Sequence, residues 1–237
     1  MRDRTASFKA LAKIVANLSD EEQLAIIDHP KRFGDLMCQF AAEVASSTYV
    51  IPVHDKDVPL PHRAAARTWR QYARAHDYNG PIAWRVKEGF TLRSHAQTAG
   101  PCSGLRYISY WDEITGDAPT DKCIVFWVPR LVSSSMDKTF VQMEERREEA
   151  KRCLELPDNH ATSFGGISLL FALVLAHFKR VGERVPLKEF FAVSDSLGVE
   201  GNRLIVGGFN KSGLQCANTV GKPRYDVGFF LLGVELL

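Results

Sequence analysis

Cysteine is scarce in this chain and shows no pairing pattern. The 237 residues include five cysteines, an odd number, and no two of them form a CxxC or CxxxC pair. Such spacing favours free thiols in a reducing compartment over a disulfide framework. A structural zinc site needs four Cys or His ligands in two close pairs, and the seven histidines do not complete such a set. We therefore expect no disulfide, no structural metal and a cytoplasmic location.

Long hydrophobic segments are also missing. The most apolar run, 164–178, is interrupted by Ser168 and His177 and is shorter than the roughly 18 to 20 residues that a bilayer crossing needs. The N-terminus carries Arg2, Asp3 and Arg4 and lacks the apolar core and cleavage site of a secretion signal. We expect no membrane span and no export, and we interpret the apolar run as a buried core helix.

Motifs that announce a cofactor or a catalytic centre are absent too. The chain has no P-loop, no GxGxxG, no GxSxG, no HExxH and no calcium-binding loop, so we expect no cofactor. One arrangement still permits chemistry: Cys102 follows His95 by seven residues, and Asp158 or Asn159 could orient the imidazole. A neighbouring imidazole is what turns a cysteine into a nucleophilic thiolate. A cysteine-dependent hydrolase-like enzyme using Cys102, His95 and Asp158 is therefore the alternative function.

What remains is the composition of an ordinary globular protein. Apolar residues make up 45% and charged residues 24%, close to the average for globular chains. A chain of this length lies at the upper end of what one hydrophobic core serves. We expect a single domain over 1–237, made of a helical N-terminal subregion, 1–48, and an α+β body, 49–237. Apolar residues at three- and four-residue spacing indicate the helices of the first part.

The body is predicted to be a mostly antiparallel sheet packed on a buried apolar helix over 163–181. Segments 105–111 and 123–128 are rich in β-branched and aromatic residues and predict a hairpin, and 203–209, 214–220 and 227–236 predict a meander. The helix should begin at a Thr162 or Ser163 cap and end at Gly182. Its side chains Leu170, Leu173, Val174 and Phe178 should be buried, and its His177 should bond to a carbonyl.

Part of the sequence resembles known proteins. The stretches LELPDNH (154–160), AHFKRVGERVPLKEF (176–190), RLIVGGF (203–209) and LGVE (232–235) resemble a group of short uncharacterised proteins from uncultured bacteria. The resemblance covers the last third of the chain, implies a bacterial protein and assigns no activity to any residue. GGFN (207–210) with the closing LGVE is also similar to the end of C-type-lectin-like domains, whose paired cysteines are absent here.

Positive charge is concentrated in one helix. The chain as a whole has a net charge of +2, but residues 60–110 hold eight basic and two acidic side chains. Segment 61–76 is predicted to be a helix in which Pro61 occupies the first turn. With 3.6 residues per turn, its four arginines fall within about 60° of one another, while Trp69 and Tyr72 lie on the opposite side. The arginines of this stripe are Arg63, Arg67, Arg70 and Arg74.

Four like charges on one face need a partner or solvent. The simplest candidate is the protein itself, because the acidic helix over 144–155 could lie across the stripe. The other candidates are a nucleic acid, an anionic membrane surface and an acidic protein surface, since the planar guanidinium suits phosphate and carboxylate. We predict a non-enzymatic binding or interaction protein that uses this stripe. The sequence does not indicate an oligomeric state.

Overall fold

The computed structural model describes residues 49–92, 118–198, 201–210 and 213–237, together with Ser19, Glu21, Gln23, Asp28 and His29. The chain forms two compact units, Met1–Ser47 and Thr48–Leu237. In the first unit Glu21 and Gln23 are helical, and the Gln23 N–H donates to the Ser19 carbonyl at 2.9 Å. The rest of the predicted helical subregion 1–48 lies outside the described residues, and the single domain over 1–237 stays a prediction.

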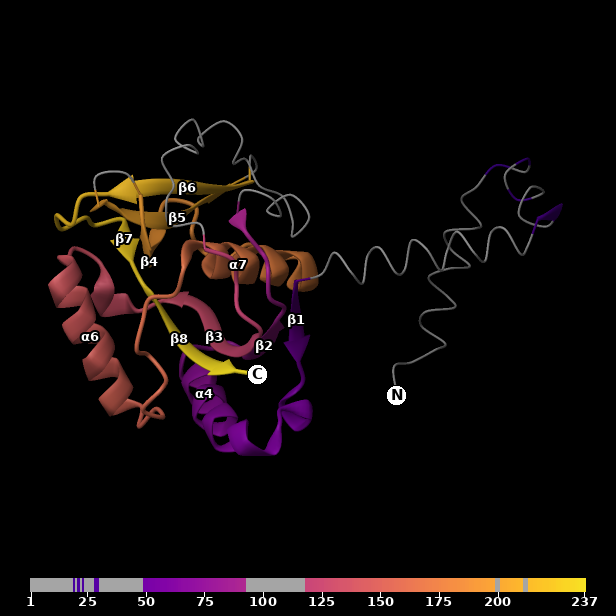
Figure 1. Ribbon diagram of the computed structural model, residues 1–237, viewed down its shortest axis with the longest axis horizontal. Coiled ribbons are helices and arrows are strands. Elements are labelled where there is room, and N and C mark those ends of the chain that lie inside the picture. Colours follow the sequence, from indigo (N-terminus) through magenta and orange to yellow (C-terminus); the bar gives the residue numbers. More distant parts are fainter. Residues whose placement is uncertain are drawn as a thin grey trace. The chain divides into compact units, whose positions relative to one another are not determined.

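The second unit contains two four-stranded sheets with helices around them (Figure 1). The first sheet is antiparallel throughout and has the order β1-β2-β3-β8, with β1 at Val50–Val53, β2 at Ala83–Val86, β3 at Cys123–Leu131 and β8 at Phe230–Leu236. The second has the order β6-β5-β4-β7, with β4 at Phe191–Leu197, β5 at Arg203–Asn210, β6 at Gly213–Thr219 and β7 at Val227–Gly228. The α+β class and its antiparallel sheet are thus confirmed.

Three α-helices and three short 3-10 turns complete the described part of this unit. The α-helices are α4 at Arg63–Ala75, α6 at Phe140–Cys153 and α7 at Ile167–Val181. The 3-10 turns are η1 at Asp55–Asp57, η2 at Leu60–His62 and η4 at Ser133–Ser135. None of the helices in the described ranges is long and apolar enough to cross a membrane.

The prediction of one sheet built from 105–131 and 203–236 was wrong in its pairing. The hairpin of β5 and β6 forms as expected, but the last predicted strand divides at Phe229. Its first residues form β7, which pairs parallel to β4, and the remainder forms β8, which pairs with β3 in the other sheet. A strand that is buried on both faces has a continuous apolar sequence and can pair in either sheet. The pattern of apolar and polar residues therefore does not predict where the strand divides. The predicted strand 105–111 lies outside the described residues.

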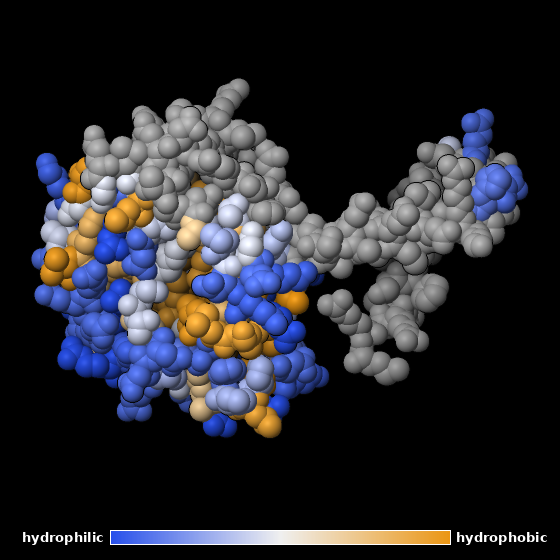
Figure 2. Space-filling view, viewed as in Figure 1, coloured by the Kyte–Doolittle hydropathy of each residue, from blue (hydrophilic) through white to orange (hydrophobic). Residues whose placement is uncertain are grey.

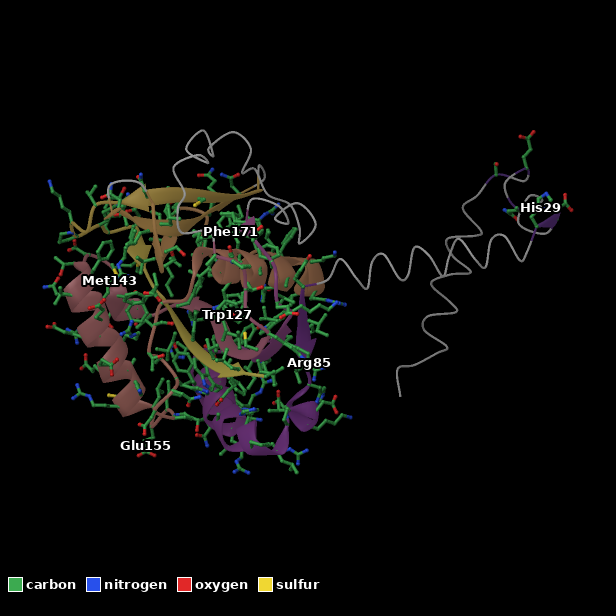
Figure 3. The ribbon with its side chains drawn as sticks, in the orientation of Figure 1. His29, Arg85, Trp127, Met143, Glu155 and Phe171 are labelled. Atoms are coloured by element: carbon green, nitrogen blue, oxygen red, sulfur yellow. The ribbon has the colours of Figure 1, made fainter. Side chains whose placement is uncertain are left out.

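Strand β3 is central and covered on both faces, as its continuous apolar sequence predicts. Val125 and Trp127 belong to the core that includes α7, whereas Ile124 and Phe126 belong to the core that includes α4. Helix α7 also packs against β4 and β5, so it contacts both sheets and not one face of a single sheet. Trp127 and Phe171 accordingly lie inside this unit (Figure 3).

The start of α7 differs from the predicted Thr162 or Ser163 cap. Gly165 has a φ of +82°, which prevents the helix from starting at residue 163, and the first helical residue is Ile167. The Asp195 carboxylate accepts from the N–H groups of Phe164 at 2.8 Å and Gly165 at 3.0 Å. Ser196 Oγ accepts from the Ile167 N–H at 3.0 Å. These N–H groups therefore bond to side chains of β4, thirty residues away, which local sequence could not indicate.

Other predictions for α7 are confirmed except for the burial of Phe178. It ends at Gly182, whose φ is +79°. Leu170, Leu173 and Val174 are buried, whereas Phe178 is only partly buried.

Helix α6 contains most of the acidic helix expected over 144–155. A capping box joins Thr139 and Gln142 at its start, and Met143 is its one buried residue. Figure 2 shows a largely hydrophilic surface over it, and Figure 3 shows Glu155 beyond its last turn. This helix therefore presents most of its surface to solvent.

Candidate functional site

The candidate site is the exposed face of α4. The segment is rich in alanine, the best helix former, and the preceding turn η2 contains Pro61, which lacks an N–H to leave unsatisfied. Its buried residues are Ala65, Ala66, Trp69, Tyr72 and Ala73. The predicted helix 61–76, with Trp69 and Tyr72 turned inward, thus matches the structure.

Trp69 fixes α4 to the first sheet. Its side chain is 0% exposed and stacks on Phe126 of β3, with ring centroids 6.4 Å apart. Its indole Nε1–H donates to His160 Nδ1 at 3.0 Å. An indole nitrogen only donates, so His160 Nδ1 must be the unprotonated nitrogen and its Nε2 carries the proton. The tautomer of His160 is therefore set by Trp69.

The protonated side of His160 faces a carboxylate. His160 Nε2 lies 2.9 Å from Glu235 Oε1, while Asn159 Nδ2 donates to Glu235 Oε2 at 2.9 Å. His62, at the start of α4, reaches the same oxygen at 3.5 Å. A side chain at position 233 would collide with the imidazole, because a Cβ there would lie 2.6 Å from His160 Nδ1, and the residue is Gly233. The network thus joins α4 to β8.

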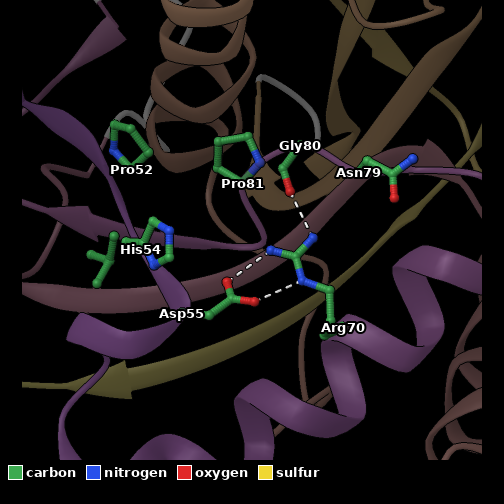
Figure 4. Close-up of a pocket in the computed structure, with 8 residues that line it drawn as sticks. Pro52, His54, Asp55, Arg70, Asn79, Gly80 and Pro81 are labelled. Atoms are coloured by element: carbon green, nitrogen blue, oxygen red, sulfur yellow. Dashed lines mark hydrogen bonds and ion pairs between the residues drawn. The ribbon is translucent and has the colours of Figure 1, made fainter.

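Arg70 is held on the surface by a bidentate ion pair (Figure 4). Its Nε and one terminal nitrogen donate to the two Asp55 oxygens at 2.8 and 2.7 Å, and its other terminal nitrogen donates to the Gly80 carbonyl at 2.9 Å. Hydrogen bonds from Arg70 hold the pKa of Asp55 below its usual 3.8. One of the four stripe arginines, Arg70, is therefore already paired within the protein.

Arg63 is exposed but oriented by the preceding turn. Its Nε donates to the Val58 carbonyl and a terminal nitrogen donates to the Lys56 carbonyl, each at 3.2 Å. Carbonyl oxygens do not neutralise a guanidinium. Arg63 therefore keeps its full charge in a fixed position beside Lys56.

Arg67 and Arg74 lie one turn before and one turn after Arg70. Both are exposed, and neither has a hydrogen-bond or ion-pair partner among the residues that the structure describes. They line a depression of about 540 Å³ whose other lining residues are Asp55, Lys56, Arg63, Ala66, Arg70 and Gln71. A second depression, of about 400 Å³, is lined by residues of β1 and of the 79–81 turn, together with Asp55 and Arg70. The two depressions therefore share the Arg70–Asp55 ion pair in their linings.

The acidic helix does not supply partners for this stripe within the described ranges, contrary to the simplest prediction. Glu144 pairs with Arg203 at 3.3 Å, and Glu148 lies 3.6 Å from Arg147. Glu149 pairs with Arg146 on the same helix. These α6 carboxylates thus lie near other cations: an i,i+3 partner for Glu149, the adjacent arginine for Glu148 and Arg203 of β5 for Glu144.

Only one of the three catalytic candidates, Asp158, lies among the described residues. Cys102 and His95 lie outside the described residues. Asp158 is exposed, and its backbone carbonyl accepts a hydrogen bond from Lys151 Nζ. The hydrolase alternative stays a prediction.

His177 is confirmed as a core histidine: it is 3% exposed, and its Nδ1 lies 3.2 Å from the Glu183 carbonyl.

Sequence reasoning missed Asp55, Lys56 and Gly80, which complete the surface of α4. Asp55 and Lys56 stand in the turn η1, and a turn of mixed charge carries no signal of the residue it will meet. His160 and Glu235 were missed for the same reason, since they belong to a bridge and a strand far apart in sequence. The sequence feature that could have indicated this contact is the presence of Trp69 and His160, because their ring nitrogens each require a hydrogen-bond partner when buried.

Acidification should destabilise the fold through two buried histidines. Burial holds the pKa of His160 and of His177 below the usual 6.5, against the opposing effects of Glu235 and of the Glu183 carbonyl. A lowered folded-state pKa means that the stabilisation is complete above about pH 6.5 and is lost as pH falls toward the folded-state value. We expect the urea midpoint to be level from pH 8 to 7 and to fall between pH 6.5 and 5. A midpoint unchanged down to pH 5 would contradict this.

Comparisons of the chain with known proteins do not indicate a function for this surface. No family model, no curated protein and no solved structure matches the chain. The resemblance to uncharacterised bacterial proteins thus stays a prediction. Within the described ranges, no group of three or more His, Cys, Asp or Glu side chains could hold a metal ion. The described part of the chain is an α+β protein whose most distinctive surface is the arginine face of α4.

Proposed function

We propose that this protein is a non-enzymatic binding protein whose α4 face binds the phosphate backbone of a nucleic acid. The observation that carries the proposal is the pair Arg67 and Arg74, two exposed guanidinium groups without a hydrogen-bond or ion-pair partner in the described structure, at one depression with Arg63 and Lys56. Bringing like charges together is unfavourable unless an anion neutralises them. An anion bound along α4 would do so.

The spacing of the charges favours a repeating anion. At 1.5 Å of rise per residue, Arg63, Arg67 and Arg74 are separated along the helix axis by about 6 and about 10 Å. A nucleic-acid strand carries a charge on every nucleotide, so one strand can contact several of these groups at once. The fork of each guanidinium also matches two phosphate oxygens.

The aromatic residues of α4 are not available to stack on bases, which leaves phosphate contacts as the proposed mode of binding. Sequence-tolerant stacking needs exposed aromatic rings, but Trp69 and Tyr72 are buried against the first sheet. Contacts to phosphate fix a protein on the strand and carry no sequence information by themselves. We therefore expect similar affinity for unrelated sequences of equal length.

The test is fluorescence anisotropy with labelled single- and double-stranded oligonucleotides of unrelated sequence, at 50 to 200 mM salt. The expected result is binding that depends on strand length and weakens linearly in log Kd against log salt. Labelled polyglutamate, which offers carboxylates without phosphates, represents the acidic protein partner. Failure to bind any oligonucleotide at 50 mM salt would overturn the proposal, and tighter binding of polyglutamate would assign the surface to an acidic protein.

The ion pair Arg70–Asp55 should limit affinity, because the carboxylate occupies the fork that a phosphate would use. Asp55→Asn should release Arg70 for one further contact, which for double-stranded oligonucleotides raises the salt slope by about 0.9 and the affinity at 0.1 M salt by about eightfold. Asp57→Asn is the matched control, since Asp57 is exposed, stands in the same turn η1 and removes the same charge. Equal gains from the two variants would show that only net charge matters.

A further inference from the structure

Three buried nitrogen atoms in the core have no hydrogen-bond partner. They are Trp84 Nε1, Trp127 Nε1 and His177 Nε2, three of the four buried side-chain nitrogen or oxygen atoms without a partner in the described structure. Their side chains are 0%, 0% and 3% exposed. Buried polar atoms are nearly always hydrogen-bonded, to protein or to ordered water, so a concentration of three exceptions needs a physical cause.

The three rings are mutual neighbours. The ring centroid of Trp84 lies 6.4 Å from that of Trp127, and the His177 centroid lies 6.4 Å from Trp84 and 5.9 Å from Trp127. Trp84 of β2 is paired with Val125 of β3, and Trp127, two residues further on, lies on the same face of the sheet. That face packs against α7, which carries His177. Trp127 is visible in the interior of this unit (Figure 3).

The hydrogen-bonding character of each nitrogen is fixed by its chemistry. The two indole nitrogens can only donate. His177 Nδ1 lies 3.2 Å from the Glu183 carbonyl, which can only accept, so Nδ1 carries the proton and Nε2 presents a lone pair. Burial lowers the pKa of His177, which keeps the ring in this neutral form. The cluster therefore offers two donors and one acceptor.

We propose that one buried water molecule occupies this cluster, accepting from both indole N–H groups and donating to His177 Nε2. A water oxygen has two lone pairs and a hydrogen to give, which matches the set of three, and buried waters commonly make about three hydrogen bonds. A metal cation would be repelled by the two N–H groups, and an anion by the lone pair of His177. The water would join β2 and β3 to α7 as a polar link within an apolar core.

The experiment is water-to-protein cross-relaxation by NMR on the full-length protein, with Trp84→Phe and Trp127→Phe used to assign the indole N–H signals. The expected result is a cross-peak to a long-lived water for Trp84 and for Trp127. Trp69 is the internal control, because its N–H donates to His160 and should show no such cross-peak. Absence of water cross-peaks at both Trp84 and Trp127 would overturn the proposal.

Two further measurements test the role of His177. His177→Phe removes the acceptor, so both water cross-peaks should disappear, and their persistence would refute the assigned bridge. A crystal structure of the wild-type protein decides the matter if this variant does not fold. Density for one oxygen within hydrogen-bond distance of all three nitrogens supports the site, and a cluster without such density refutes it.

Discussion

Replacing Arg67 and Arg74 together by alanine should weaken the binding of double-stranded oligonucleotides about 60-fold at 0.1 M salt. Each contact to a phosphate of B-DNA adds about 0.9 to the log–log salt slope, so the two contacts contribute about 1.8 log units relative to 1 M salt. The slope itself should fall by about 1.8. The loss should be the same for unrelated base sequences, because neither side chain is proposed to contact a base edge. Anisotropy titrations at several salt concentrations measure both quantities.

Fold stability should hardly change in this double variant. Both side chains are exposed and make no hydrogen bond or ion pair with the described residues, and such surface substitutions stay within about 0.5 kcal/mol. Arg152→Ala with Arg180→Ala is the matched control: it removes the same two charges from exposed positions on α6 and α7. Comparable losses of affinity in the two double variants would show that the affinity depends only on net charge and not on the positions of Arg67 and Arg74. Unchanged affinity with a lowered melting temperature would assign the two arginines a structural role.

The parts of the site that sequence could predict are those set by local periodicity. The stripe of arginines and the inward face of Trp69 follow from 3.6 residues per turn over 61–76, and the structure has that helix. What sequence could not predict is which arginine is already paired. Arg70 pairs with Asp55, which lies in the turn η1 directly after β1. This contact depends on tertiary structure and not on local periodicity.

The fold shows the same division between local and long-range information. Gly182 ends α7 as predicted, because a left-handed residue at a helix end is a local requirement. The pairing of β3 with β8 joins segments about a hundred residues apart, and both are apolar on both faces, so nothing in either identifies its neighbour. The cap that Asp195 provides for Phe164 and Gly165 is likewise a contact between distant segments.

The second large effect is expected at the residue that fixes the arginine helix. Trp69→Ala should lower the free energy of unfolding by about 3 to 5 kcal/mol, the usual cost of deleting a buried aromatic side chain. It removes the stacking on Phe126 and the edge contact with Tyr72, and it leaves His160 Nδ1 without a donor. Urea unfolding followed by circular dichroism measures the change.

Trp69→Phe separates the hydrogen bond from the packing. It keeps most of the ring but removes the indole N–H, which leaves the buried His160 Nδ1 unsatisfied at a cost of about 1 to 3 kcal/mol. A Trp69→Phe protein as stable as the wild type would contradict the Trp69–His160 bond. Where Trp69→Phe remains folded, its oligonucleotide affinity should equal that of the wild type, because Arg67 and Arg74 still lie on an intact helix. Lost affinity in that folded variant would mean that α4 needs the His160 and Glu235 network for its position as well as for its stability, since the arginines themselves are unchanged.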